Sequence, residues 1–331
     1  MAGQHKRKIK STTVYLRFHL FSEHVREIQQ AGKMNETKTN HLLRNTGTSV
    51  LTNAVNVDRS FFYGMMVPWV GGGMLTLGGE AWRTRRKAVK PGYHFRILDG
   101  YVPILNRRGE RLVKKMSGMG GGFFNVIPVA RAATLGVLLE TTMGVDYDEE
   151  IERVGYLNIH DALSDSVTKR AANFHYWFDS IYAFTRECRE MKRNVEKARK
   201  FVDTILQKRM ADYKKGIRDP ISSNVFLEIL LLMCVDEGTL TEIDVRDECM
   251  AMLIGGFDPT ASNIAHTLYL LGLHPEVQAK VHDEIILVCG EDWDKPFTAE
   301  EVKDLTYMEC ALKVSDCATS SAIPAFDQPR E

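Results

Sequence analysis

The sequence predicts a mainly helical protein, and three observations support this fold class. Apolar residues recur at helical spacing in most segments between residues 80 and 313. Two capping boxes, Thr241-x-x-Asp244 and Thr298-x-x-Glu301, mark helix starts. Strand-like runs are few, the best being residues 123–127. The 331 residues, 44% hydrophobic and 26% charged, suffice for one large globular domain or two ordinary ones.

Charge and cysteine content exclude several functional classes. The 43 basic and 43 acidic residues balance, so there is no net attraction to nucleic acid or anionic lipid. The cysteines are scattered without a C-x-x-C pair, which indicates a reducing compartment and no zinc site (Cys188, Cys234, Cys249, Cys289, Cys310 and Cys317). No run reaches the ~18 apolar residues of a membrane span. The basic N-terminus lacks the apolar segment of a signal peptide. On these features alone the chain is expected in the cytosol.

The amino-acid composition changes at two points in the first third of the chain. Residues 1–48 are polar and weakly periodic, so partial disorder is expected there apart from a short helix at 21–30. Residues 60–79 are rich in glycine and aromatic residues and predict a compact loop rather than a helix. Residues 80–89 predict a helix that ends at Pro91-Gly92.

That first helix carries a candidate anion site. Trp82 and Arg86 are four residues apart and share a face, so an indole N–H and a guanidinium converge from one side, as suits a carboxylate or phosphate. Taken alone, the pattern W-x-x-x-R is more often a solvated basic helix that its tryptophan anchors to the core. Both interpretations stay open at this point.

Helices are predicted next at 97–116, 129–142, 156–170 and 186–215. The last is strongly charged with one apolar stripe (Met191, Val195, Val202, Ile205 and Leu206), so its opposite face is solvated. Before it lies an aromatic cluster, residues 174–178 with Ile181, Tyr182 and Phe184. Such a cluster is expected first to lie in the hydrophobic core. The alternatives are a substrate entrance and a surface ridge that touches a membrane. Residues 216–224 predict a surface loop.

The central prediction is one long buried helix from Thr241 to about Gly272 with a polar weak point. Its segment 250–273 is apolar nearly all round, yet it holds Gly255, Gly256, Asp258 and Pro259. A proline inside a helix costs about 3 kcal/mol, so the deformation marks either a ligand site or a kinked core helix. His274-Pro275 starts another helix through Leu287. A helix from Thr298 to about Lys313 comes next, and residues 314–331 predict a disordered tail.

Three sequence segments, in the same order as in that family, resemble cytochrome P-450, the haem-thiolate monooxygenases, and specifically its family-4 branch. GGEAWRTRRKAVKPGYHFRIL resembles the haem-propionate helix and its sequel. LTEIDVRDECMAMLIGGFDPTASNIAHTLYLLGLHPEVQAKVHDEI resembles the long oxygen-groove helix and the next helix, and LTYMECALK resembles the start of a later helix. The resemblance runs from about residue 49 to 313. It implies a partial cytochrome P-450 domain between a separate segment 1–48 and a non-homologous tail 314–331.

The resemblance implies roles for named residues. Trp82 and Arg86 match the pair that binds a haem propionate, and Arg83, Arg85 and Lys87 would face a reductase. Gly255 and Gly256 match small residues that let haem and dioxygen approach the backbone. Asp258 would organise proton delivery. Pro259 stands where the family has a threonine hydroxyl donor, so Thr260 is the candidate substitute. No metal ligand is assigned.

The sequence departs from the family at Val314 and Cys317, which occupy the positions of the E-x-x-R pair. No cysteine has the context F-x-x-G-x-x-x-C-x-G of the thiolate ligand, and the family's N-terminal anchor and first sheet are not found. The sequence Val-Ser after Lys313 is what a splice-donor site encodes, so we expect residues 314–331 to be intron translation in a truncated, mainly helical cytochrome P-450 fold.

The resemblance therefore implies an oxidoreductase lineage that inserts one oxygen atom into an apolar, fatty-acid-like or xenobiotic substrate. It implies haem iron, electrons from NADPH through cytochrome P-450 reductase, and the endoplasmic reticulum membrane. Without thiolate and E-x-x-R, this chain is expected to be inactive. The alternatives are a non-catalytic helical fragment that binds an apolar ligand or partner, and an unstable product of intron read-through. A reduced-CO spectrum separates them. No nucleic-acid partner is expected.

Overall fold

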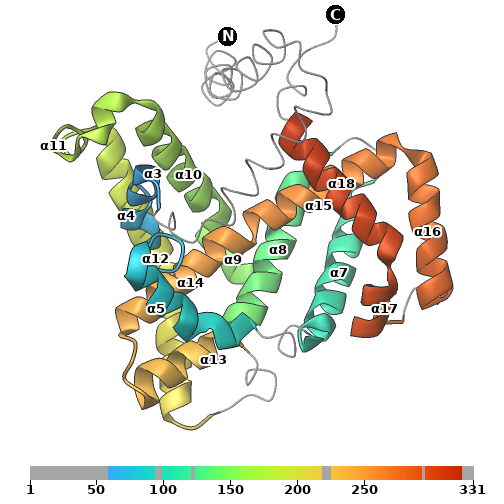
Figure 1. Cartoon of the computed structure of the whole chain (residues 1–331), viewed down its shortest axis with the longest axis horizontal. Helices are drawn as coiled ribbons and strands as arrows, with labels where there is room; N and C mark the ends of the chain where they lie inside the picture. The colour runs from blue at the N-terminus through green and yellow to red at the C-terminus, as the bar shows by residue number, and fades with distance from the viewer. Residues whose placement is uncertain (1–58, 94–98, 121–123, 218–224, 293–294, 323–331) are drawn as a thin grey trace, which may run out of the picture. The chain divides into compact units, whose positions relative to one another are not determined.

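The computed structural model describes residues 59–93, 99–120, 124–217, 225–292 and 295–322 (Figure 1). These residues are mainly helical and contain no strand, which confirms the predicted fold class. The chain divides into two units, Arg59–Asp316 and the combination of Met1–Asp58 with Cys317–Glu331. The first unit holds nearly all of the described residues. The expectations for residues 1–48 lie outside the described residues.

Helix α8 (Val126–Met143) is the centre of the packing. Helix α7 (Val102–Ser117) runs beside it and α15 (Asp258–Leu273) packs across it (Figure 1). Asn125 caps the start of α8 by accepting from the Ile127 amide, and Gly144 ends it in the left-handed conformation at φ 69°. Leu135, Leu139 and Met143 are fully buried because α8 is covered on several sides. Among the described helices α8 alone is long and apolar enough to span a membrane, by length and composition only, and half of it is buried.

Two antiparallel helices form a second layer. Helix α10 (Tyr156–Ala172) follows the short α9 (Asp148–Val154) and packs along α12 (Arg186–Lys214). The connection between α10 and α12 contains η2 (Phe174–Trp177) and α11 (Asp179–Tyr182). Thr185 caps α12 through the Cys188 amide at 3.1 Å. All five residues of the predicted apolar stripe of α12 are buried, which confirms the one-sided character read from the sequence.

The predicted central helix is two helices. After α13 (Phe226–Leu231) and a π-helical turn, η4 (Leu232–Asp236), helix α14 (Glu242–Gly256) begins at the predicted capping box of Thr241 and Asp244. It ends at Phe257, and α15 starts at Asp258 with Pro259 in its first turn. The single helix was wrong because Pro259 has no amide to donate, whereas a proline fits a helix's first turn without losing a bond.

The last helices are α16 (Pro275–Cys289), α17 (Ala299–Asp304) and α18 (Thr306–Ala322). The capping box at Thr298 is confirmed, but a break at Leu305 divides the single predicted helix. Glu284 of α16 caps α18 by accepting from the Tyr307 and Met308 amides at 2.7 and 2.8 Å. The expectation of an irregular tail after Lys313 was wrong as far as Ala322, since α18 continues.

The continuation of α18 packs against α15. The hydroxyls of Thr267 and Ser315 lie 2.8 Å apart, and both residues are buried. Ser315 comes after the point at which the family-like sequence stops, so the segment directly after Lys313 still contributes to the core.

Other local predictions need correction. The segment 60–79 contains two short helices, α3 (Phe61–Gly64) and α4 (Val67–Val70), before its glycine-rich turn. No strand forms at 124–127, because α8 already starts at Val126. Helix α5 (Gly79–Val89) is confirmed and continues into η1 (Lys90–Tyr93). The loop predicted at 216–224 falls almost wholly outside the described residues.

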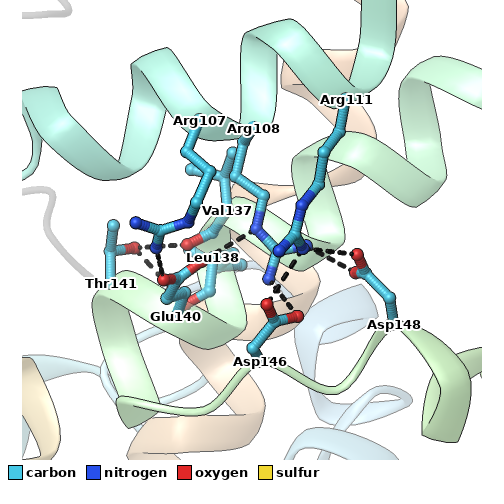
Figure 2. A network of polar contacts seen from close by, with 9 residues as sticks. All are labelled: Arg107, Arg108, Arg111, Val137, Leu138, Glu140, Thr141, Asp146 and Asp148. Atoms are coloured by element: carbon cyan, nitrogen blue, oxygen red, sulfur yellow. Dashed lines mark hydrogen bonds and ion pairs between the residues drawn. The ribbon is translucent and has the colours of Figure 1, made fainter. Parts of the chain in front are cut away.

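A polar network joins α7 to α8 and to the turn before α9 (Figure 2). Arg108, only 3% exposed, contacts Glu140 through Nε at 2.8 Å, Asp146 through Nη2 at 2.9 Å and Asp148 through Nη1 at 2.5 Å. The half-exposed Arg111 binds the same two aspartates, and Arg107 also pairs with Glu140. Three cations and three anions balance, which is what makes a buried guanidinium tolerable.

Gly136 of α8 makes room for this network. A Cβ atom at this position would lie 2.6 Å from Nη1 of Arg108 and 2.9 Å from Oδ1 of Asp148. The absence of a side chain at residue 136 therefore lets the Arg108 guanidinium lie against the surface of α8.

Candidate functional site

Helix α5 presents the candidate anion pair. Trp82 is half-buried, and its indole Nε1 is buried without a hydrogen-bond partner. Arg86 is exposed, lies over the Trp82 ring at 6.0 Å, and donates to the Met74 sulfur at 3.7 Å. A buried N–H without an acceptor costs free energy, about 1–3 kcal/mol for a hydrogen-bonding group left unsatisfied. The pair therefore offers two donors to an external acceptor.

The neighbouring basic residues divide between two faces. Arg83 pairs with Glu80 at the surface, and Lys87 is exposed. Arg85 turns inward instead: its side chain is 13% exposed, and its Nη atoms lie 2.5 Å from Asp244 and 3.6 Å from Glu248 of α14. The expectation that Arg85 lies on a reductase-facing surface is therefore wrong, because these carboxylates hold it against α14.

Two buried carboxylates of α14 hold the glycine-rich turn that precedes α5. Asp247 accepts from the Gly72 amide at 2.7 Å, and Glu248 accepts from the Met74 amide at 3.0 Å. Gly71 has φ 81°, and a Cβ there would lie 2.1 Å from the Asp247 Cγ. Burial raises the pKa of Glu248 even though the Met74 amide and Arg85 oppose the shift. This turn sets the position of α5, and with it Trp82.

The break between α14 and α15 is exposed on one side. Gly255, Pro259 and Thr260 are exposed, whereas Phe257 is fully buried. A Cβ at Gly255 would meet nothing within 4 Å, but one at Gly256 would lie 2.8 Å from the Leu138 side chain. Gly255 therefore borders open space, while Gly256 allows α14 to approach α8.

The Thr260 hydroxyl donates to the Gly256 carbonyl at 2.7 Å. This bond back to the preceding turn satisfies a carbonyl close to the break, and Pro259 itself offers no donor. The hydroxyl can change acceptors by rotating, so Thr260 stays a candidate donor at this exposed position.

Asp258, the predicted proton-handling residue, is part of a charged cluster. Its Oδ1 lies 2.6 Å from Nε of Arg131 on α8, and Nη2 of Arg131 donates to Asp161 of α10 at 2.6 Å. The Nδ1 atom of the buried His160 lies 3.2 Å from the same Nη2. Burial lowers the pKa of His160, and Arg131 lowers it further, against the opposite effect of Asp258 and Asp161.

The sequence did not reveal this cluster. Arg131, His160 and Asp161 come from α8 and α10, and no motif in either segment marks them. Only the packing of both helices around the break brings them to Asp258.

The two parts of the candidate site lie at different points of α14. Arg85 and the glycine-rich turn contact α14 at Asp244, Asp247 and Glu248, whereas the break comes after Gly256. Seven residues separate Glu248 from Gly255, or about 10 Å along a helix axis. Helix α14 therefore fixes the spacing between the α5 anion pair and the break.

The aromatic cluster is mostly at the surface. The exposed members include Phe174, Phe178, Ile181 and Phe184, whereas Tyr182 is deeply buried. The expectation that this cluster belongs to the core was therefore wrong for most of its residues. The cause is that η2 and α11 lie in the connection beyond the ends of α10 and α12.

A cavity of about 960 Å³ lies along α12 beside α11 and α4. Its lining includes the buried side chains of Tyr182, Met191 and Val195, together with charged side chains of both signs such as Lys192, Glu196 and Asp203. The cavity has the size of a small-molecule site.

No group of three His, Cys, Asp or Glu side chains in the described part of the chain could hold a metal ion. Cys188, Cys234, Cys249, Cys289 and Cys310 are free thiols, and burial raises the pKa of Cys249 to about 12. Burial also raises the pKa of Cys234 and of Cys289.

Comparison with known proteins gives a consistent result. A sequence model of the family described as Cytochrome P450 matches residues 35–313, and so reaches into the segment 1–48. "Cytochrome P450 4V2" of Mus musculus is 33% identical over 282 residues, covering 80% of this chain and 53% of that protein. The protein of the same name from Homo sapiens is 32% identical over the same shares, and "Cytochrome P450 4d10" of Drosophila mettleri is 31% identical over 274 residues. The chain spans about half the length of these relatives.

Proposed function

Because the chain belongs to the cytochrome P450 family, we propose that it carries one part of a haem-dependent monooxygenase site. The observation that carries this proposal is the unpartnered Trp82 indole N–H beside the exposed Arg86 guanidinium. Such a pair suits one carboxylate oxygen for each donor. The open space beside Gly255 supports the same proposal, because a flat ring can approach helix backbone only where no side chain intervenes.

These residues fit a haem group. Trp82 and Arg86 would hold a propionate, and Gly255 would border the ring. When bound, haem supplies the iron at which dioxygen is activated. Asp258 would accept and pass on a proton at its carboxylate oxygen, and Thr260 would offer its hydroxyl near the break. Gly256 lets α14 approach α8 at Leu138, and its backbone stays a candidate contact of the ring.

Family membership suggests the remaining components. The substrate would be a small apolar molecule, such as a fatty acid or a xenobiotic. Electrons would come from NADPH through cytochrome P450 reductase, for which Arg83 and Lys87 remain candidate contacts on the exposed face of α5. The location would be the endoplasmic reticulum membrane.

We infer that these 331 residues do not complete the site. Val314 and Cys317 stand where the family's E-x-x-R pair belongs, and neither can form an Arg–carboxylate bridge. None of the chain's cysteines has the sequence context F-x-x-G-x-x-x-C-x-G that the family places around its thiolate ligand. Monooxygenase turnover by this chain alone is therefore not expected.

A haemin titration tests the propionate assignment. Arg86→Ala should weaken haemin binding about 10- to 100-fold, because a hydrogen bond to a charged group is worth about 1.5–3 kcal/mol. Trp82→Phe should have a similar or smaller effect. Arg83→Ala is the matched control, since Arg83 lies on the neighbouring face and pairs with Glu80. Unaltered affinity in both Arg86→Ala and Trp82→Phe would contradict the assignment.

A second candidate function is a non-catalytic helical protein that binds an apolar ligand. The cavity along α12 favours it, because buried apolar side chains beside charged ones suit an amphipathic molecule. The reduced-CO difference spectrum of the haemin-treated chain separates the candidates. Haemin uptake without a thiolate-type band supports the partial haem site, and a thiolate-type band would contradict the inferred incompleteness. No haemin uptake, together with binding of a fluorescent fatty acid that Met191→Trp weakens, supports the second candidate.

A further inference from the structure

The charged cluster at the helix break involves four elements. Asp258 starts α15, Arg131 lies on α8, His160 and Asp161 lie on α10, and Trp69 of α4 packs its ring edge against His160 at 5.2 Å. Arg131 is the common member, since it alone touches both aspartates and the histidine.

Arg131 also lies against the break itself. Its guanidinium carbon lies 5.7 Å from the centroid of the Phe257 ring, which the His160 ring also contacts at 4.7 Å. Thr134, one turn further along α8, has its hydroxyl 3.0 Å from the Phe257 carbonyl oxygen. Helix α8 thus contacts the break through a ring, a carbonyl and the carboxylate of Asp258.

The guanidinium contacts the imidazole and both carboxylates. Arginine only donates, so its 3.2 Å contact from Nη2 to Nδ1 of His160 is a hydrogen bond when Nδ1 carries the lone pair, and protonation of Nδ1 would oppose it. The same cation forms ion pairs with Asp258 and with Asp161, each at 2.6 Å. Arg131 is 14% exposed, Asp258 41% and Asp161 55%, so the cation is the least hydrated member of this trio.

We propose that Arg131 is the positioning residue of Asp258: it holds the carboxylate at the first turn of α15 and ties that turn to α8 and α10. In the absence of Arg131, two carboxylates would face His160 without a counter-charge. The imidazole would then take up a proton and become the partner of Asp258. The functional importance of this position rests on the proposed function, but the contacts themselves do not.

The experiment measures His160 directly. The full chain is prepared with isotope-labelled histidine, and the imidazole resonance, assigned by its loss in His160→Gln, is titrated with pH. The groups that face His160 are Arg131 of α8, Asp161 of α10 and Asp258 of α15, together with the rings of Trp69 and Phe257.

Arg131→Met should raise the midpoint of the His160 titration by about one pH unit or more, because removing a cation favours the imidazolium. Arg131→Lys keeps the charge and should restore most of the wild-type midpoint. Asp258→Asn should shift it in the opposite direction, downward, since Asp258 favours the imidazolium. Arg170→Met, which removes an arginine of α10 that pairs with Asp179, is the matched control and should leave it unchanged.

Amide hydrogen exchange supplies the second readout. Arg131→Met should speed exchange in the first turns of α15 about tenfold or more relative to wild type, and Arg131→Lys should not. If Arg131→Met and Asp258→Asn leave the His160 midpoint and α15 exchange as in wild type, the proposal is overturned. Neither measurement needs haem, so failure of the haemin titration with these shifts intact would overturn the proposed function alone.

Discussion

In the network of Figure 2, a buried and an exposed arginine bind the same carboxylates, so their contributions to the free energy of unfolding can be compared. Arg108 and Arg111 both bind Asp146 and Asp148, but their side chains are 3% and 45% exposed. Removing one partner of a buried ion pair costs about 3–5 kcal/mol. Asp146 and Asp148 remain half-hydrated and Glu140 keeps Arg107, so we expect Arg108→Met to cost about 3 kcal/mol. Arg111→Met should cost about 0.2–1 kcal/mol, as for other exposed pairs.

Urea unfolding followed by far-UV circular dichroism measures both changes. The free energies of unfolding are compared at a common urea concentration near the transition, with the slopes checked for equality. Adding Glu140→Gln to Arg108→Met should recover part of the loss, because the buried carboxylate no longer needs a full counter-charge. Equal losses in Arg108→Met and Arg111→Met would refute the argument that burial, rather than the number of contacts, decides the energy.

Local geometry supports three further predictions. Gly71→Ala should destabilise the chain by about 2–5 kcal/mol in the same urea assay, through the positive φ and the overlap with Asp247, whereas Gly64→Ala, which meets nothing within 4 Å, should be nearly neutral. Glu284→Gln should speed amide exchange at the start of α18 about tenfold, because the first turn loses a charged acceptor; unchanged exchange there would contradict the capping role. Burial opposes ionisation of Asp146, but the hydrogen bond from Arg111 and the charge of Arg108 outweigh it and lower the pKa below 3.8. Its contribution is therefore present above pH 3.8 and lost as pH falls through the lower folded-state value, so the stability gap between wild type and Asp146→Asn should close in acid.

Local signals in the sequence predicted much of the fold. The capping boxes at Thr241 and Thr298, the stripe on α12 and the start of α16 at Pro275 are all where they were expected. Each depends on hydrogen bonds or periodicity within a few residues. Predictions that depended on the surroundings of a segment failed more often, as for the aromatic residues around Phe178, which resemble a core segment but lie in an exposed connection.

The candidate site divides in the same way. The shared face of Trp82 and Arg86 results from a spacing of four, and the weak point at Pro259 results from chemistry alone. The inward turn of Arg85 depends on Asp244, a carboxylate 159 residues away, and the cluster around Asp258 depends on two other helices. Such long-range partners carry no local signal.

Gly136 and Arg108 illustrate a constraint on how this chain can change. The guanidinium occupies space that any side chain at residue 136 would need, with Nη1 only 2.6 Å from the missing Cβ. Gly136→Ala should therefore be more harmful beside Arg108 than beside a shorter residue, where only the 2.9 Å approach to Asp148 remains, while loss of Arg108 is itself costly. The two positions are epistatic, because each single variant is less stable than the wild type. An apolar junction between α7 and α8 therefore requires both substitutions together.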